Sequence, residues 1–255
     1  MGSWKLADGI WQEASSIDLT DRGFRYGMSV FETVAVADSR PLLLNDHLAR
    51  LARAASDCGA HLPAMPSFDF TQTSSGLLRF YLTFGSGKPT APFDGNLFAI
   101  FEPNEVTWKL ADARVMTCAA PYLPRPGGWK TGNYWQNIDA LATAQHSDCD
   151  EALLFNPAGM LVSASMANVF LQIRENWLTP TLATGTRDGA VRSWAIAHIG
   201  AEETVIESEQ LQLAKACFLT NSRYGVRSVA ELDGRPLENL VAPLQQKYRH
   251  EIFDV

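Results

Sequence analysis

A segment rich in proline and glycine near the middle of the chain sets the strongest limit on the fold. Residues 121–128 read Pro-Tyr-Leu-Pro-Arg-Pro-Gly-Gly. Proline lacks the amide hydrogen that a helix or a central strand needs, and glycine weakens either structure, so this segment favours neither. We therefore expect a stiff connector at residues 121–128, with folded structure before and after it.

Lys130 follows the connector directly, and the aromatic residues Trp129 and Tyr134 lie close to it in the sequence. Apolar and aromatic neighbours can remove water from an amine, and burial lowers the pKa of a lysine because it disfavours the charged form. The neutral amine that results is a nucleophile. A lysine taken alone is usually a solvated surface charge, so a reactive Lys130 needs support from the rest of the chain.

Composition limits the class of protein and of partner. With 255 residues, 46% of them hydrophobic, the chain can bury the core of one large domain or two modest ones. The net charge of −7, with no run of Lys or Arg, argues against nucleic acid as a partner. No apolar stretch approaches the ~20 residues of a membrane span, and the N-terminus lacks the apolar core of a signal peptide. We expect no membrane and no nucleic-acid partner.

Cysteine and histidine usage indicates a cytoplasmic protein without a metal site. The four cysteines are far apart and form no C-x-x-C pair: Cys58, Cys118, Cys149 and Cys217. Scattered cysteines are typical of reduced thiols packed as small hydrophobic side chains. The five histidines form no H-E-x-x-H motif, so we expect no bound metal.

Hydrophobic periodicity in the N-terminal half predicts strands around one helix. The expected elements are a strand over 30–36, a short returning strand over 42–44, a helix over 45–55, and strands over 77–84 and 97–101. Glu32 interrupts the apolar set of the first strand and hints at a site. Asn45 or Asp46 can cap the helix. Gly-Ser-Gly-Lys at 85–88 lacks the first glycine of a P-loop, so we expect a hairpin or long loop there.

The C-terminal half also alternates strands and helices. Two strand-like runs are expected within 106–118, a helix near Ile138, strands over 151–155 and 169–173, a helix near Val191, a short helix over 208–216, strands over 218–222 and 226–229, and a terminal helix over 240–253. Gly189 precedes the helix near Val191, an arrangement that can bind an anion, although a simple cap is the more common meaning.

Several motifs recur together and in order along the chain. They are D-R-G-x-x-Y-G-x-x-x-F-E-T at 21–33, H-L-x-R-L at 47–51, K-x-x-N-Y at 130–134, N-V-F at 168–170, T-P at 179–180, G-x-x-R at 189–192 and T-N-S-x-x-G-V at 220–226. Together they resemble the class IV aminotransferase family, the pyridoxal-phosphate (PLP) enzymes of fold type IV. The family includes branched-chain aminotransferase, D-amino-acid aminotransferase and 4-amino-4-deoxychorismate lyase, and the short chain with T-N-S-x-x-G-V looks most like the lyase.

The resemblance implies a fold and an assembly. It implies an α/β (α+β) chain with the two-domain fold of D-amino-acid aminotransferase. A small N-terminal α/β domain would cover residues 1–120, the connector 121–128, and a larger C-terminal domain carrying Lys130 would cover 129–255. It also implies PLP as the cofactor and a homodimer.

The resemblance further implies which residues bind the cofactor. Lys130 matches the lysine that binds PLP covalently, and Arg50 matches the arginine that holds its phosphate, although Arg50 taken alone is more often a solvated charge. The remaining matches are the backbone amides of Ala190 and Val191 at the phosphate, Ser222 beside them, Asn168 of N-V-F, Ser163, and Tyr134. Tyr134 lies one place nearer the lysine than the tyrosine of the branched-chain enzymes.

Ser163 departs from the family's pattern. The family normally has a glutamate five residues before the asparagine of N-V-F, where it bonds to the pyridine nitrogen. A carboxylate keeps the pyridine protonated and the ring a strong electron sink, whereas a serine hydroxyl supplies no charge. Transamination needs that sink more than β-elimination does, because in an elimination the electrons leave with the departing group. Ser163 therefore favours a lyase.

Three interpretations follow. The first is a PLP-dependent lyase resembling 4-amino-4-deoxychorismate lyase, which would form 4-aminobenzoate and pyruvate with Lys130 as the base. The second is an aminotransferase of the branched-chain or D-amino-acid type. The third is a non-catalytic paralogue, and Ser163 is its only basis. A small-molecule substrate is expected for either enzyme, and the candidates for binding it are Tyr26, Arg25, Arg79 and Arg125; spacing does not choose among the arginines.

Overall fold

The computed structural model describes residues 1–93, 95–104, 106 and 110–254. The chain divides into two compact units: unit 1 comprises Met1–Val106 and Trp129–Asn133, and unit 2 comprises Thr107–Gly128 and Tyr134–Val255. The division therefore differs from the one expected from the sequence, because residues 129–133 belong to unit 1. Each unit is described by itself.

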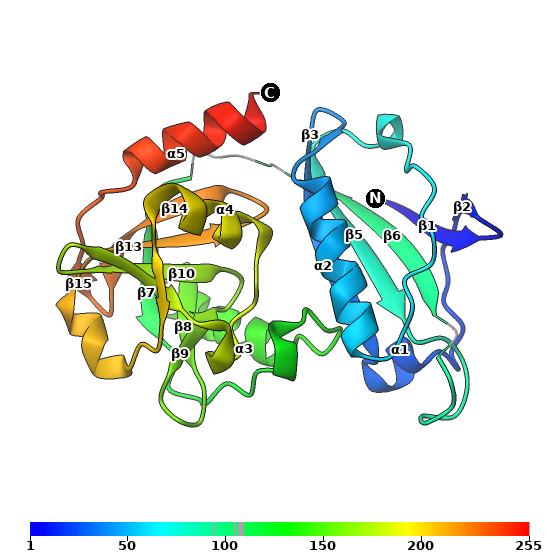
Figure 1. Ribbon diagram of the computed structural model, residues 1–255, viewed down its shortest axis with the longest axis horizontal. Helices are drawn as coiled ribbons and strands as arrows, with labels where there is room; N and C mark the ends of the chain where they lie inside the picture. The colour runs from blue at the N-terminus through cyan, green and yellow to red at the C-terminus, as the bar shows by residue number, and fades with distance from the viewer. Residues whose placement is uncertain (94, 105, 107–109, 255) are drawn as a thin grey trace. The chain divides into compact units, whose positions relative to one another are not determined.

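Unit 1 is built on a six-stranded sheet in the order β2-β1-β6-β5-β3-β4, with antiparallel neighbours throughout. Its strands are β1 (Gly2–Ala7), β2 (Ile10–Glu13), β3 (Ser29–Ala37), β4 (Arg40–Pro41), β5 (Gly76–Thr83) and β6 (Asn96–Pro103), and its α-helices are α1 (Arg22–Tyr26) and α2 (Leu44–Asp57). The long helix α2 runs along one face of this sheet (Figure 1). The predicted strands at 30–36, 77–84 and 97–101 and the helix at 45–55 are confirmed.

Alternation along β3 decides which side chains meet the helix. Val30, Val34 and Val36 are buried in one cluster with Leu51 of α2. Phe31, Thr33 and Ala35 therefore point to the opposite face, because successive side chains of a strand alternate. The two faces of β3 thus serve different purposes: one forms the core and the other is available for a site.

The turn before α2 differs from the prediction. The returning strand is the two-residue β4 rather than residues 42–44, and the helix begins at Leu44. Leu43 precedes it in a left-handed conformation, with φ of 53°, and among the described residues no side chain caps the helix. Asn45 and Asp46 lie inside the first turn, so neither is the N-cap.

Arg22 organises the loop between β5 and β6. Its guanidinium is fully buried and donates hydrogen bonds to five carbonyl oxygens, those of Gly85, Ser86, Lys88, Ala91 and Pro92, at 2.8–3.4 Å. Each of these carbonyls would otherwise need a partner elsewhere. The segment at 85–88 is therefore part of a loop, as expected. Its carbonyl oxygens accept hydrogen bonds from the positively charged guanidinium of Arg22.

Asp21, the neighbour of Arg22, fixes the strand ends at the same loop. Its carboxylate is fully buried and accepts hydrogen bonds from Thr83 Oγ1 at 2.7 Å and Asn96 Nδ2 at 3.0 Å. It also caps α1 by accepting from the Gly23 amide at 2.6 Å. The first two residues of the D-R-G motif thus stabilise the fold of unit 1.

Unit 2 is built on a nine-stranded mixed sheet in the order β12-β11-β10-β13-β14-β7-β8-β9, with β15 paired to β14. Its strands are β7 (Ala113–Thr117), β8 (Glu151–Phe155), β9 (Leu161–Ala164), β10 (Asn168–Ile173), β11 (Asn176–Pro180), β12 (Glu202–Thr204), β13 (Ala214–Asn221), β14 (Gly225–Leu232) and β15 (Arg235–Pro236). Its α-helices are α3 (Trp135–His146), α4 (Ala190–Ile199) and α5 (Ala242–Tyr248). Within this unit, the predicted strands at 151–155 and 169–173 and the helices near Ile138 and Val191 are confirmed (Figure 1).

Three expectations for unit 2 need correction. The predicted helix at 208–216 is a 3₁₀ helix over Ser208–Leu213, and β13 begins at Ala214 because Ala214, Cys217 and Leu219 join the buried core. The terminal helix ends at Tyr248 and continues as a π-helical turn over Arg249–Phe253. Within 106–118 the structure has the strand β7; residues 107–109 lie outside the described residues.

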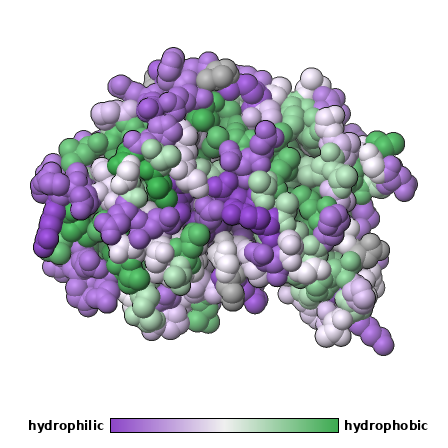
Figure 2. Space-filling model, in the orientation of Figure 1, coloured by the Kyte–Doolittle hydropathy of each residue, from purple (hydrophilic) through white to green (hydrophobic). Residues whose placement is uncertain are grey.

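The visible surface mixes hydrophilic and hydrophobic residues (Figure 2). All four cysteines are free thiols, as expected. In the part of the chain that the structure describes, no helix is long and apolar enough to cross a membrane.

Replacing Arg22 by Met should lower the free energy of unfolding by about 3 kcal/mol, because the carbonyls that Arg22 binds would remain buried without donors. The matched control is Arg25→Met on the same helix, where the side chain is exposed and the expected change is within about 0.5 kcal/mol. Urea unfolding followed by circular dichroism measures both. Equal stability of the two variants would show that the buried guanidinium does not hold the loop.

Candidate active site

The Lys130 amine lies on the face of the unit 1 sheet that is turned away from α2. Its Nζ donates a hydrogen bond to Thr33 Oγ1 at 3.0 Å and lies 4.6 Å from the centroid of the Phe31 ring. Thr33 and Phe31 are both buried, and Lys130 itself is half-buried. An aromatic face attracts a cation, and a hydroxyl can accept from or donate to an amine. The amine is therefore held in place with a polar partner.

Backbone pairing with β3 holds the Lys130 segment. The Phe31 amide donates to the Lys130 carbonyl at 2.8 Å, and the Gly132 amide donates to the Ser29 carbonyl at 3.0 Å. Gly132 also allows the close approach, since a Cβ there would collide with Ser29 Oγ. Because these bonds fix the backbone on both sides of Lys130, they explain why residues 129–133 belong to unit 1.

Glu32 lies on the other face of β3, so its place among apolar residues has a structural explanation. Its Oε2 is 2.7 Å from Nδ1 of His47 on α2, and the His47 side chain is only 3% exposed. Arg50 follows one turn later on the same helix. Its side chain is 11% exposed, donates to the Asp46 carbonyl at 3.1 Å and lies 3.8 Å from the Asp46 carboxylate. Arg50 is thus far more buried than an ordinary surface arginine.

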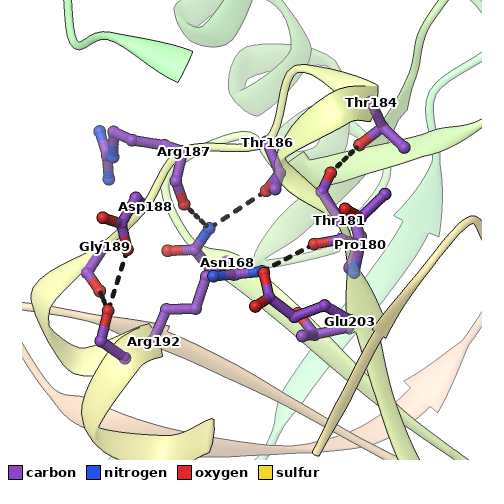
Figure 3. Close-up of polar contacts among 12 residues, drawn as sticks. Asn168, Pro180, Thr181, Thr184, Thr186, Arg187, Asp188, Gly189, Arg192 and Glu203 are labelled. Carbon is purple, nitrogen blue, oxygen red and sulfur yellow. Dashed lines mark hydrogen bonds and ion pairs between the residues drawn. The ribbon is translucent and has the colours of Figure 1, made fainter. Parts of the chain in front are cut away.

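The start of α4 in unit 2 is a separate candidate binding feature. Gly189 is the N-cap in an extended conformation, and among the described residues no side chain caps this helix. Asn168 on β10 fixes the preceding loop, since its Nδ2 donates to the Arg187 carbonyl at 2.8 Å and to Thr186 Oγ1 at 3.3 Å (Figure 3). A Cβ at Gly189 would collide with Asn168 Oδ1.

The chemistry of this helix start fits an anion such as a phosphate. Ala190 and Val191 are buried, and helix-start amides point along the axis toward the positive end of the helix dipole. The Asp188 carboxylate accepts a hydrogen bond from Ser193 Oγ at 2.9 Å. Asn168 acts on this helix start through the loop, by binding its backbone.

The arginine of G-x-x-R has a structural role. Arg192 is 2% exposed; its guanidinium donates to the Pro180 carbonyl at 2.8 Å and binds the Glu203 carboxylate (Figure 3). It thus ties α4 to the end of β11 and to the middle residue of β12.

Ser163 lies within β9, half-buried and directly opposite Leu154 of β8. Leu154 packs against α3 together with Ala140 and Ala144, and Tyr122 of the connector contacts the same cluster. Side chains of directly opposed residues share one face of a sheet, so Ser163 lies on the α3 face. The sequence did not predict the strand that carries it.

A buried carboxyl, Glu151, supports the turn that follows Ser163. Its Oε2 accepts hydrogen bonds from Ser165 Oγ and from the Met166 amide at 3.0 Å, and Asn137 Nδ2 donates to the Ser165 carbonyl at 2.8 Å. Burial raises the pKa of Glu151 from 4.5 to about 7, although the bonds from Ser165 and Met166 oppose the shift. Glu151 was not among the residues predicted from the sequence, because its partners come close to it only when β8 and β9 pair.

The remaining predicted residues divide into two groups. Tyr134 and Ser222 are half-buried in unit 2; Tyr134 precedes α3, and Ser222 follows β13. Arg25 and Tyr26 are exposed on α1 with their side chains in a cation–π contact at 4.9 Å, and Arg125 is exposed in the connector.

Arg79 is the substrate-binding candidate that shares a face with Lys130. It lies on β5 directly opposite Thr33 and forms an ion pair with Glu102 at 2.5 Å. Thr33 is the hydroxyl that binds the Lys130 amine, so the strand register distinguishes Arg79 from the other two arginines. Across the described residues, no three His, Cys, Asp or Glu side chains come together as a metal ion requires.

Glu151→Gln should remove a pH dependence of stability. The folded state keeps the Glu151 proton up to about pH 7, whereas the unfolded state loses it near pH 4.5. A raised carboxyl pKa stabilises the fold fully below pH 4.5, and this stabilisation is lost as pH rises to 7, by about 3 kcal/mol in all. Urea unfolding at pH 4.5, 6 and 8 should therefore show a steeper fall for the unmodified protein than for the variant. Parallel curves would contradict the assignment.

Comparison with known proteins places the chain in a family. The model of the family "Amino-transferase class IV" matches residues 29–232. A putative branched-chain-amino-acid aminotransferase of Methanocaldococcus jannaschii is 23% identical over 273 residues, covering 96% of this chain and 92% of that protein. Aminodeoxychorismate lyase of Bacillus subtilis is 25% identical over 263 residues, covering 91% and 88%.

Solved structures share the fold. The 4-amino-4-deoxychorismate lyase of Pseudomonas aeruginosa superposes with a TM-score of 0.81 at 24% identity, covering 98% of each chain. The branched-chain aminotransferase of Thermoproteus uzoniensis superposes with a TM-score of 0.82 at 22% identity, covering 98% of this chain and 92% of that one. The chain therefore belongs to the class IV aminotransferases and, like the other members of that family, is a pyridoxal-phosphate-dependent enzyme.

Proposed function

We propose that this enzyme is a lyase of the 4-amino-4-deoxychorismate lyase type, which converts aminodeoxychorismate into 4-aminobenzoate and pyruvate. Ser163 carries the proposal. It stands where the family normally has a glutamate, and its hydroxyl can bond to the pyridine nitrogen without supplying a charge. A weaker electron sink suits an elimination, in which the departing group takes the electrons, better than an amino-group transfer.

Lys130 and the start of α4 are the cofactor-binding residues of this proposal. Lys130 forms the covalent bond to PLP, which its half-buried position and its Thr33 partner support. Arg50 and the amides of Ala190 and Val191 bind the phosphate; low exposure of Arg50 and the helix start without a side-chain cap support that role. Ser222, half-buried after β13, adds a hydroxyl.

The bound cofactor supplies a conjugated ring that withdraws electrons from the carbon next to the substrate amine. The Lys130 amine would act as the general base that takes the proton from that carbon. The C–O bond to the enolpyruvyl group breaks, and its electron pair leaves with the oxygen. That group gains one proton and becomes pyruvate, while the six-membered ring becomes aromatic. Thr33 accepts a hydrogen bond from the Lys130 amine at 3.0 Å and so holds the amine in position.

Arg79 is the substrate-binding arginine of this proposal. Its place opposite Thr33 puts it on the face of the sheet that carries the Lys130 amine. A guanidinium can bind a carboxylate through two parallel hydrogen bonds, and the ion pair of Arg79 with Glu102 at 2.5 Å supports a carboxylate as its partner. The same arginine would suit the carboxylate of an amino acid, so it also favours the second candidate, an aminotransferase.

Borohydride reduction of the protein loaded with PLP should attach the cofactor permanently to Lys130. Peptide mapping by mass spectrometry locates the label, and Lys130→Arg should abolish it. Lys247→Arg is the matched control, since Lys247 is exposed on α5 and should leave labelling unchanged. A label on another lysine would refute the assignment of the reactive amine.

Ser163→Glu should restore the stronger electron sink. We expect the variant to convert bound PLP with amino acids at least about tenfold faster than the unmodified protein, with little gain in pyruvate release from aminodeoxychorismate, because the charge keeps the pyridine protonated. Absorbance spectra follow the first reaction and a lactate dehydrogenase assay the second, both at saturating PLP.

Ser163→Gln is the matched control, since it has the size of glutamate without the charge. Rapid transamination by the unmodified protein, without pyruvate release, would favour the aminotransferase. A protein that binds no PLP even as Ser163→Glu would leave only the non-catalytic interpretation.

A further inference from the structure

We propose that Arg187 is a specificity-determining residue that binds a carboxylate of the substrate. Arg187 lies in the loop before α4 and was not among the candidates from the sequence. The inference rests on the proposed function, since it assigns a residue to the substrate of that same site.

The backbone of Arg187 is held rigidly. Its carbonyl accepts a hydrogen bond at 2.8 Å from Nδ2 of Asn168, whose side chain is only 3% exposed. The same amide nitrogen lies 3.3 Å from Thr186 Oγ1. The Arg187 side chain extends away from both residues (Figure 3). A guanidinium that starts from a fixed backbone loses less freedom on binding a ligand.

Two tyrosines are neighbours of the Arg187 guanidinium. Arg187 donates to the Tyr134 hydroxyl at 3.4 Å. Burial raises the pKa of Tyr122, and Tyr134 raises it further, while a hydrogen bond to Asn137 and the charge of Arg187 oppose the shift. Arg187 therefore lies near enough to Tyr122 to influence its hydroxyl. Tyrosine hydroxyls can orient a guanidinium and also donate to a carboxylate that it binds.

Tyr122 links Arg187 to the face of the sheet that carries Ser163. Tyr122 packs against the cluster that contains Leu154, and Leu154 is directly opposite Ser163 in the β8–β9 pair. Tyr122 is thus a neighbour both of Arg187 and of the cluster that contains Leu154.

Arg187 brings a positive charge to a set of predicted cofactor-binding residues that carry none. The predicted cofactor-binding residues of unit 2 are uncharged: Tyr134, Ser163, Asn168, Ala190, Val191 and Ser222. Serine replaces the glutamate that other members of the family have, and Arg187 adds a positive charge. The neighbouring Asp188 carboxylate accepts a hydrogen bond from Ser193. The planar guanidinium of arginine matches a carboxylate through two hydrogen bonds.

The test compares acid and amide ligands of the same shape. The two pairs are 4-aminobenzoate with 4-aminobenzamide, and glutarate with glutaramate; the first is related to the lyase product and the second to an aminotransferase substrate. Calorimetry with the PLP-loaded protein gives the ratio of the dissociation constants within each pair. The unmodified protein should prefer the acid in at least one pair, and Arg187→Gln should reduce that preference about tenfold or more. Arg187→Lys should restore part of it, because the charge remains but the fork is lost.

Arg174→Gln is the matched control, since it removes the same charge from an exposed turn of unit 2 and should change no ratio. The affinity for PLP, measured by absorbance titration, should stay the same in Arg187→Gln; a loss there would assign Arg187 to the phosphate and overturn the inference. Unchanged ratios in both pairs, or no preference in the unmodified protein, would also overturn it. Pyruvate release by the unmodified protein tests the proposed lyase separately, because the binding ratios need no turnover.

Discussion

Backbone pairing between residues 130–132 and the start of β3 fixes the position of Lys130, the residue proposed to carry the reactive amine. The bonds from Phe31 to Lys130 and from Gly132 to Ser29 place Lys130 above a strand whose other face is the core of unit 1. Core packing therefore positions Phe31 and Thr33, and these two residues hold the amine. The stability of the sheet and the geometry of the chemistry depend on the same strand.

Much of the sequence pattern shared with the family supports the fold rather than the chemistry. Asp21 and Arg22 clamp the β5–β6 loop, Glu32 pairs with His47, and Arg192 ties α4 to two strands. Asp21, Arg22 and Arg192 are buried charged groups, and each has hydrogen-bond or ion-pair partners that offset part of the cost of burial. The residues proposed for the reaction form a separate set, which includes Lys130 and Ser163.

The sequence predicted what depends on local periodicity. Strands β3, β8 and β10 have alternating or continuously apolar side chains, and the helix α2 has a clear apolar repeat. It did not predict contacts between distant residues: Lys130 and Thr33 are 97 positions apart, and their meeting depends on how the chain returns to unit 1. Glu151 and Arg187 were not predicted for the same reason, since the contacts that single them out are made with residues on other elements. The cofactor contacts of Arg50 and Ser163 stay predictions.

The return of residues 129–133 to unit 1 makes that unit discontinuous in sequence. A fragment cut at the connector would contain every strand of the first sheet but would lack the lysine and the backbone partners of Phe31 and Ser29. The complementary fragment would carry the lysine without the sheet that holds it. Neither fragment would contain the complete unit 1. An exchange of unit 1 between relatives must therefore transfer residues 1–106 and 129–133 together.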